Sequence, residues 1–372
     1  MMSAMVHGLM QRDAASQALT SSATALLLLG ALSSKDALST IAGSGYNPNT
    51  VAEYDLYHKI LYVQATKGRF TPLDLAVISH EYERALQDHY FNLGALLTDS
   101  GNASSHNADA RLARAAVVEG DAFTTMLSYA ATFDSRQRLQ FTQQLQRSAQ
   151  PAASDYLHDA IGFPASQGTT FVTAIRAAAA KGKMSAAARQ AAGNNAVDQA
   201  LRAPPASTAQ VLNPALYLQH TTSHEAPLPV PDAPLGAGWM KVDSDVMGAY
   251  GIDDLLQEHA AAHSATAQAA DQAAAGWQSD RWVVYQRNKD TVLVWYLRFS
   301  SAGAATSFVH ALTDYTAARF HTTLMAQSRL DWRTTGYAMG VRQHNVEIAV
   351  AIGSDKALLS QCDQALKALG FS

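Results

Sequence analysis

Residues 71–88 read TPLDLAVISHEYERALQD and combine a helix start with a chemical motif. Thr71 is a typical N-cap residue, Pro72 suits the first helical position, and Asp74 places a carboxylate in the first turn. Apolar residues then recur at helical spacing. The sequence therefore predicts one long helix that begins at Thr71 and runs to about Leu97.

A histidine–glutamate pair lies in the middle of this predicted helix. Zinc-protease helices carry histidines at positions i and i+4, so that both imidazoles reach one metal, and the glutamate after the first histidine is the general base. Here His80 and Glu81 fill the first two positions, but Arg84 stands at i+4. Taken alone, this pair is better explained as part of a polar helix face.

The composition is that of a globular protein. The chain has 372 residues, of which 48% are apolar and 16% charged, and its net charge of −4 gives no reason to expect a nucleic-acid partner. The most apolar run, Ala25 to Leu32, is too short to span a bilayer and is expected to form a buried helix rather than a signal peptide. The single cysteine, Cys362, excludes an intrachain disulfide and a thiolate zinc cluster, and we expect it in the core.

The first part of the chain, residues 1–202, is expected to be a mainly helical domain with one short β-hairpin. Its predicted elements are two or three helices within residues 3–42, hairpin strands at Tyr54–Leu56 and Lys59–Gln64, the helix that begins at Thr71, a polar loop at Asp99–His106, a helix at about Ala108–Ala131, and Ala-rich helices within residues 135–202. Residues 203–238 are rich in proline and predict an extended connector and a domain boundary.

The last part, residues 239–372, is expected to be a small α+β domain made of two ββα units. The first unit comprises strands Trp282–Arg287 and Thr291–Phe299 with helix Ala302–Phe320, and the second comprises strands Tyr337–Arg342 and Val346–Ile352 with helix Ser354–Leu369. A small antiparallel sheet with helices on one face is the expected packing, with Trp277, Trp282 and Trp295 in the core. The whole chain is thus predicted to be α+β.

Six segments resemble, in their order, a family of largely uncharacterised bacterial zinc metallopeptidases. They are YD at 54–55, ILYV at 60–63, ISHEYERALQD at 78–88, AAVVEGDA at 115–122, PPASTAQVLNP at 204–214 and AAAGWQSDR at 273–281. The family pattern reads Y-D, I-Y-V, H-E-x-x-H-A-L-Q-D, V-E-G-[DE]-A, P-P-x-S-T-E-Q-[VI]-L-H-P and A-A-x-G-W-x-G-D-R. The combination is far more specific than any single segment.

The resemblance implies a zincin-like helical domain with a metal site between two neighbouring helices. It makes His80 the first zinc ligand, Glu81 the general base and Glu119 the third protein ligand. For this to hold, the helix that begins at Thr71 and the helix at 108–131 must be adjacent. An exported protein is also implied by the resemblance, although the sequence shows no signal peptide.

The chain departs from the family pattern at positions that carry ionisable or metal-binding groups. Arg84 replaces the second histidine, Asn213 replaces a histidine, and Ala209 and Ala249 stand where the pattern has glutamate. Such changes indicate a chain in which these positions no longer need to support a metal site.

Arg84 is the decisive departure. His80 and Glu119 are too few for the three protein ligands of a catalytic zinc site, and a fixed positive charge would repel the cation. Glu83 is a conceivable substitute ligand, but Arg84 would still crowd the pocket. We expect Arg84 to form an ion pair with Glu119 or Glu81 in place of the metal, and the alternative is that it extends into solvent.

Three functions follow as hypotheses. The leading one is a degenerate, catalytically inactive metallopeptidase-like protein that keeps a cleft for a peptide or protein partner and needs no cofactor. The second is an active metal-dependent hydrolase with an altered ligand set, which would bind zinc. The third is a structural or interaction protein that acts through its C-terminal domain.

Overall fold

The computed structural model describes residues 23–32, 51–64, 68–98, 106–148, 156–220, 228–232, 234–321, 329–334 and 336–371. Most of the predicted helices within residues 3–42 and most of the predicted loop at Asp99–His106 lie outside these ranges. Within them, residues 23–29 form a helix, and the apolar run Ala25 to Leu32, which overlaps it, is largely buried, as expected. No described helix is long and apolar enough to cross a membrane.

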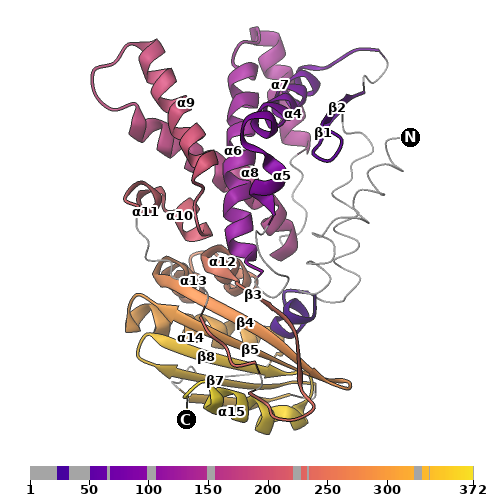
Figure 1. Ribbon diagram of the computed structural model, residues 1–372, viewed down its shortest axis with the longest axis vertical. Helices are drawn as coiled ribbons and strands as arrows, with labels where there is room; N and C mark the ends of the chain where they lie inside the picture. The colour runs from indigo at the N-terminus through magenta and orange to yellow at the C-terminus, as the bar shows by residue number, and fades with distance from the viewer. Residues whose placement is uncertain are drawn as a thin grey trace.

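The upper half of the molecule is helical and carries one hairpin (Figure 1). Its elements are β1 (Ala52–Asp55), β2 (Ile60–Val63), α4 (Pro72–Phe91), α5 (Leu93–Leu97), α6 (Ala108–Ala130), α7 (Ser135–Ser148), α8 (Tyr156–Ala179) and α9 (Ala186–Arg202). The predicted hairpin is confirmed, with β1 and β2 antiparallel. The predicted helix at 108–131 is confirmed as α6, which packs against both α4 and α8.

Helix α4 begins as predicted and ends earlier than predicted. Thr71 accepts a hydrogen bond from the backbone N–H of Asp74, and the Asp74 carboxylate accepts from the backbone N–H of Thr71, which is a complete capping box. The helix stops at Phe91 because Asn92 adopts the left-handed conformation at φ 54°, and Asn92 then caps α5 through the backbone N–H of Ala95. The prediction of one continuous helix to Leu97 was therefore wrong.

The proline-rich stretch is less extended than its composition suggests. It contains the short helices α10 (Thr208–Leu212) and α11 (Pro214–Leu218). Thr208 and Val211 of α10 are buried, and α10 packs against α6, α8 and the later helix α12 (Gly248–Gln257). Farther on, Leu228 and Leu235 are also buried. The described parts of this stretch thus pack along the body of the protein.

The lower half contains a six-stranded antiparallel sheet with strand order β3-β4-β5-β8-β7-β6. The strands are β3 (Met240–Asp245), β4 (Trp277–Arg287), β5 (Asp290–Phe299), β6 (Arg329–Arg333), β7 (Ala338–His344) and β8 (Glu347–Gly353), and the helices besides α12 are α13 (Ala265–Gly276), α14 (Ala302–Arg319) and α15 (Leu359–Ala368). The two predicted ββα units are present as β4-β5-α14 and β7-β8-α15. The α+β fold class is confirmed, and the edge strands β3 and β6 are additions to the predicted topology.

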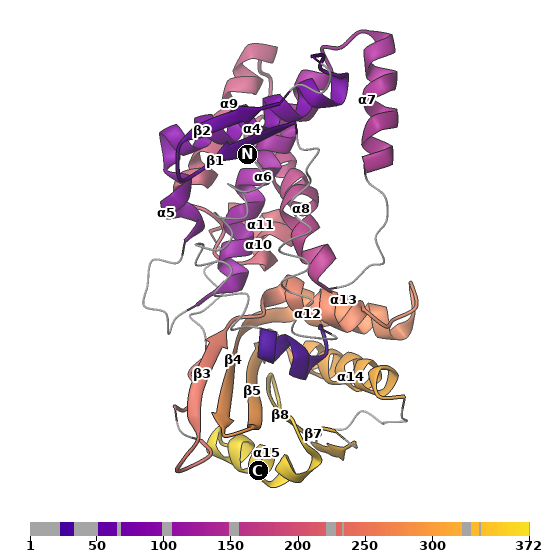
Figure 2. The same cartoon turned by 90° about the vertical axis from the view of Figure 1, so that its right-hand side faces the viewer.

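Helices cover both faces of this sheet, so the prediction of helices on one face was wrong. Trp295 and alternate strand residues face α12, α13 and α14, whereas Val292 and Val294 face α15 on the opposite side (Figure 2). Both sets are buried because the central strands are apolar on both faces. The predicted core positions of the three tryptophans and of Cys362 are confirmed.

Candidate functional site

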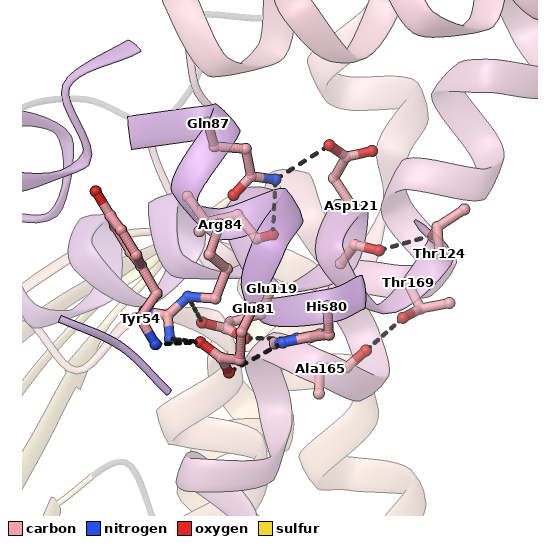
Figure 3. A network of polar contacts seen from close by, with 12 residues as sticks. Tyr54, His80, Glu81, Arg84, Gln87, Glu119, Asp121, Thr124, Ala165 and Thr169 are labelled. Carbon is pink, nitrogen blue, oxygen red and sulfur yellow. Dashed lines mark hydrogen bonds and ion pairs between the residues drawn. The ribbon is translucent and has the colours of Figure 1, made fainter. Parts of the chain in front are cut away.

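The motif residues of α4 meet Glu119 of α6 in one cluster of charged side chains (Figure 3). His80, Glu81 and Arg84 lie on one side of α4, and Glu119 faces them from the neighbouring helix. The side chains are between 12% and 26% exposed, so the cluster is largely shielded from water. The predicted adjacency of the two helices, with Glu119 beside His80, is confirmed.

The four side chains form a closed ring of alternating charges. His80 Nε2 lies 3.2 Å from Glu119 Oε2, and His80 Nδ1 lies 3.2 Å from Glu81 Oε1. Arg84 Nη1 donates to Glu81 Oε2 at 3.3 Å, and Arg84 Nε lies 3.2 Å from Glu119 Oε1. The Nε–H of Arg84 is not aligned for a hydrogen bond with any described acceptor, so its contact with Glu119 is mainly coulombic. Arg84 therefore bridges two carboxylates and does not form a bidentate pair with one.

The hairpin is tied to the same cluster. The backbone N–H of Tyr54 on β1 donates to Glu81 Oε2 at 2.9 Å (Figure 3). Glu53, the preceding residue, lies close enough that burial, Glu81 and Asp55 raise the pKa of its carboxyl. Glu81, which the resemblance makes the general base, thus holds a strand and an arginine with one carboxylate oxygen.

The protonation states follow from this arrangement. Burial alone would lower the pKa of His80, but its contacts with Glu119 and Glu81 raise the pKa to about 9. Burial would raise the pKa of Glu119, but the hydrogen bond from His80 and the charge of Arg84 lower it. At neutral pH His80 and Arg84 are therefore cationic and Glu119 is anionic.

These residues do not fit a metal ion. A histidine ligand presents a ring-nitrogen lone pair to the metal, yet both ring nitrogens of His80 lie 3.2 Å from carboxylate oxygens, Nδ1 from Glu81 and Nε2 from Glu119. Arg84 occupies the space between the two carboxylates that would face the cation. Among the described residues, no group of three or more His, Cys, Asp or Glu side chains is arranged to hold a metal.

Glu83, the conceivable substitute ligand, belongs to a different set of side chains. Burial, followed by the charge of Asp121, raises the pKa of Glu83, while a hydrogen bond with Thr125 lowers it. Both partners lie on α6 on the C-terminal side of Glu119. The structure therefore does not bring Glu83 into the ring around His80.

The rest of the motif builds the frame around the ring. Asp88, at the end of α4, accepts hydrogen bonds from the hydroxyl of Tyr54 at 2.6 Å, from Lys59 Nζ at 2.6 Å and from the backbone N–H of Leu93 at 3.0 Å. Gln87 donates to the carbonyl of Val118 and to Asp121 Oδ2 on α6. Asp88 therefore connects α4 to the hairpin, and Gln87 connects α4 to α6. Sequence reasoning gave these two residues no role, although the resemblance included them.

Gly120, in the V-E-G-D-A segment, has a packing role. A Cβ atom there would overlap the backbone of Gly168 on α8, and a Cβ atom on Gly168 would overlap the carbonyl of Ala116. The two glycines permit the close crossing of α6 and α8. This crossing fixes the helix that presents Glu119.

The remaining departures from the family pattern lie elsewhere. Ala209 and Ala249 are buried in the large hydrophobic cluster that includes α12 and the sheet, and Asn213 caps α11 through the backbone N–H of Ala215. Among the interactions of the described residues, none joins any of these three residues to the ion-pair ring of His80, Glu81, Arg84 and Glu119. The structure thus separates them from the site at Arg84.

Comparisons with known proteins concern the lower half of the chain. A family model described as a domain of unknown function, DUF8575, matches residues 235–363. No curated protein and no solved structure matches the chain. The match spans β3 to the start of α15 and leaves the helical half with its ion-pair ring outside the matched region.

Proposed function

We propose that this chain is a degenerate zinc metallopeptidase-like protein that has exchanged its metal centre for a ring of ion pairs and acts by binding rather than by hydrolysis. The observation that carries the proposal is the position of Arg84, which bridges the Glu81 and Glu119 carboxylates at 3.3 and 3.2 Å. An arginine keeps its charge at every physiological pH, so the metal position is blocked permanently.

The ring also accounts for the mechanical role that a metal would have. A metal held by His80 and Glu119 would connect α4 to α6. Here the His80–Glu119 and Arg84–Glu119 contacts connect the same helices, and Glu81 adds β1 through the backbone N–H of Tyr54. The contacts of Asp88, Gln87 and Gly120 around the ring support the proposal that the helix arrangement was kept while the metal centre was lost.

We further propose that the bound partner is an extended peptide segment with apolar side chains. The hairpin exposes Tyr57, Ile60 and Val63 at 77%, 45% and 45%, and Tyr82 on α4 is 56% exposed. Among the described strands β2 pairs with β1 alone, and an unpaired strand edge accepts an extended peptide through main-chain hydrogen bonds.

Metal content and peptidase activity test the first part of the proposal. Protein purified without chelator and then equilibrated with excess zinc should retain none after desalting, as measured by inductively coupled plasma mass spectrometry. It should also release no product from an unstructured protein substrate such as casein. Stoichiometric zinc that disappears in His80→Ala, together with hydrolysis that disappears in Glu81→Gln, would refute it.

Selection from a random peptide display library tests the binding part. Enriched clones should lose binding to an Ile60→Lys/Val63→Lys variant and keep binding to a control with two exposed changes on α7, Leu139→Lys and Gln143→Lys. Clones that bind the hairpin variant as well as the wild type would show that the hairpin edge is not the binding surface.

A further inference from the structure

A second buried polar cluster lies where the two halves of the molecule meet, and it involves neither His80 nor Arg84. Three carboxyl groups gather there: Asp109 in the first turn of α6, Asp245 at the end of β3, and Asp280 on β4. Their residues are 3%, 2% and 0% exposed. Three buried carboxyls in one place are costly to ionise together.

Two of the three carboxyls accept hydrogen bonds from several residues, although burial raises the pKa of both. Asp280 accepts hydrogen bonds from the backbone N–H groups of Met247 and Gly248 and from the indole N–H groups of Trp277 and Trp295, all at 2.8–3.0 Å. Asp245 accepts from the backbone N–H of Ala108 at 2.6 Å and from that of Val246 at 2.8 Å, and Arg111 Nη2 lies 3.6 Å from it.

Asp109 differs because all of its hydrogen bonds with described residues come from one residue, Thr208. The backbone N–H of Thr208 lies 3.2 Å from both of its oxygens, and the Thr208 hydroxyl makes a short hydrogen bond with Oδ1. Within the described part of the chain no cationic side chain pairs with Asp109. Its carboxyl also packs tightly against Gly248, at φ 76°, where a Cβ atom would overlap it.

The charged and titratable groups around Asp109 come from each neighbouring element. β4 contributes Asp280 and the end of β3 contributes Asp245, both of which raise the pKa of Asp109, while α6 itself contributes Arg111, which is engaged with Asp245. Tyr156 on α8 lies in the same electrostatic neighbourhood, as does Asp254 on α12, whose pKa burial raises to about 8. Burial is the largest of the causes that raise the pKa of Asp109 to about 7, and the charges of Asp280 and Asp245 act in the same direction. The hydrogen bonds with Thr208 lower this pKa.

Thr208 also connects Asp109 to the lower half of the molecule. Its hydroxyl oxygen accepts a hydrogen bond from the backbone N–H of Tyr250 on α12 at 3.0 Å. Asp109, Thr208 and Tyr250 therefore join α6, α10 and α12 in one chain of contacts. An uncompensated charge on Asp109 would be buried at its centre.

We propose that this junction is a protonation-controlled latch, in which Asp109 in its neutral acid form holds α10 and α12 against the start of α6 and its ionisation loosens α10. A carboxyl in the opened junction is exposed to water and ionises at an ordinary acidic pH, so opening releases a proton. Rising pH therefore favours the open form, by at most about tenfold per pH unit between roughly pH 4 and pH 7, and has little further effect above that range.

Hydrogen exchange of the full-length protein, read by mass spectrometry from pH 5 to pH 8, tests this latch. After correction for the intrinsic exchange rate, peptides covering 203–218 should lose protection up to pH 7 and then level off, while peptides from β5 should not change. Asp109→Asn replaces the acid with a neutral amide of the same shape and should clearly weaken the pH dependence of residues 203–218. Asp134→Asn, at an exposed position before α7, should leave it intact.

Two results would overturn the latch. One is wild-type protection of 203–218 that does not change between pH 5 and pH 7, a result that needs no variant. The other is an Asp109→Asn protein that retains the full pH dependence. Neither depends on zinc binding or on the ring at Arg84, so the latch and the proposed function are tested separately.

Discussion

Removing Arg84 should destabilise the protein clearly, because two shielded carboxylates would lose their bridging cation. An exposed ion pair contributes about 0–1 kcal/mol, whereas breaking a fully buried pair costs about 3–5 kcal/mol. The Arg84 side chain is 19% exposed, and those of Glu81 and Glu119 are 12% and 26% exposed. The ring lies between the two limits, so we expect Arg84→Ala to lower the free energy of unfolding by about 2–3 kcal/mol.

Urea unfolding followed by circular dichroism gives this difference, and three further variants assign it. Arg84→Lys should recover part of the loss, because it restores the charge without the planar fork. Arg138→Ala, on an exposed face of α7, should change stability by less than about 0.5 kcal/mol. In a double-mutant cycle, Arg84→Ala and Glu119→Gln should couple by about 1 kcal/mol or more. A loss below about 0.5 kcal/mol for Arg84→Ala would mean that the side chain extends into solvent, and would refute the reasoning.

Three other variants or conditions test the frame and the charge state of the ring. Gly120→Ala should destabilise the helical half by about 3 kcal/mol or more in urea unfolding, because its methyl group would overlap Gly168. The control Gly162→Ala places the same methyl group in open space on α8 and should be neutral or stabilising by up to about 1 kcal/mol. Tyr54→Phe removes the hydroxyl that donates to Asp88 and should cost about 1–2 kcal/mol, with Tyr90→Phe, on an exposed ring, as the unaffected control. Because the pKa of His80 is raised from 6.5 to about 9, its contribution to stability should be complete below pH 6.5 and disappear as pH rises through 9. The free energy of unfolding of the wild type and of His80→Gln, measured from pH 6 to pH 10, tests this, and a difference that stays constant over the range would contradict it.

Local sequence signals predicted the start of α4 and the place of the site. Thr71 and Asp74 are a complete cap in the sequence alone, and the i to i+4 spacing placed His80 and Arg84 on one side of the helix. The end of the helix was not predicted, because Asn92 is a weak helix-stop signal until Asp88 is seen to accept the backbone N–H of Leu93.

Long-range packing explains what the sequence did not reveal. Val292 and Val294 alternate with Leu293 and Trp295 on β5, so this strand is apolar on both faces. The sequence was nevertheless interpreted as a sheet with helices on one face, and the position of α15 on the other face came only from the structure. Asp109 and Thr208 are 99 residues apart, and no local pattern predicts their contact. The connector was interpreted from its prolines, whereas its packing depends on Thr208.

The zinc content of Arg84→His, compared with that of the wild type, tests the central claim most directly. If Arg84 stands in the place of the missing ligand, histidine at this position joins His80 and Glu119 in a three-ligand set. The variant should then retain close to one zinc per chain after desalting, while the wild type and a control Arg136→His retain none. An Arg84→His protein that is folded and binds no zinc would contradict the claim that Arg84 replaced a metal ligand in this site.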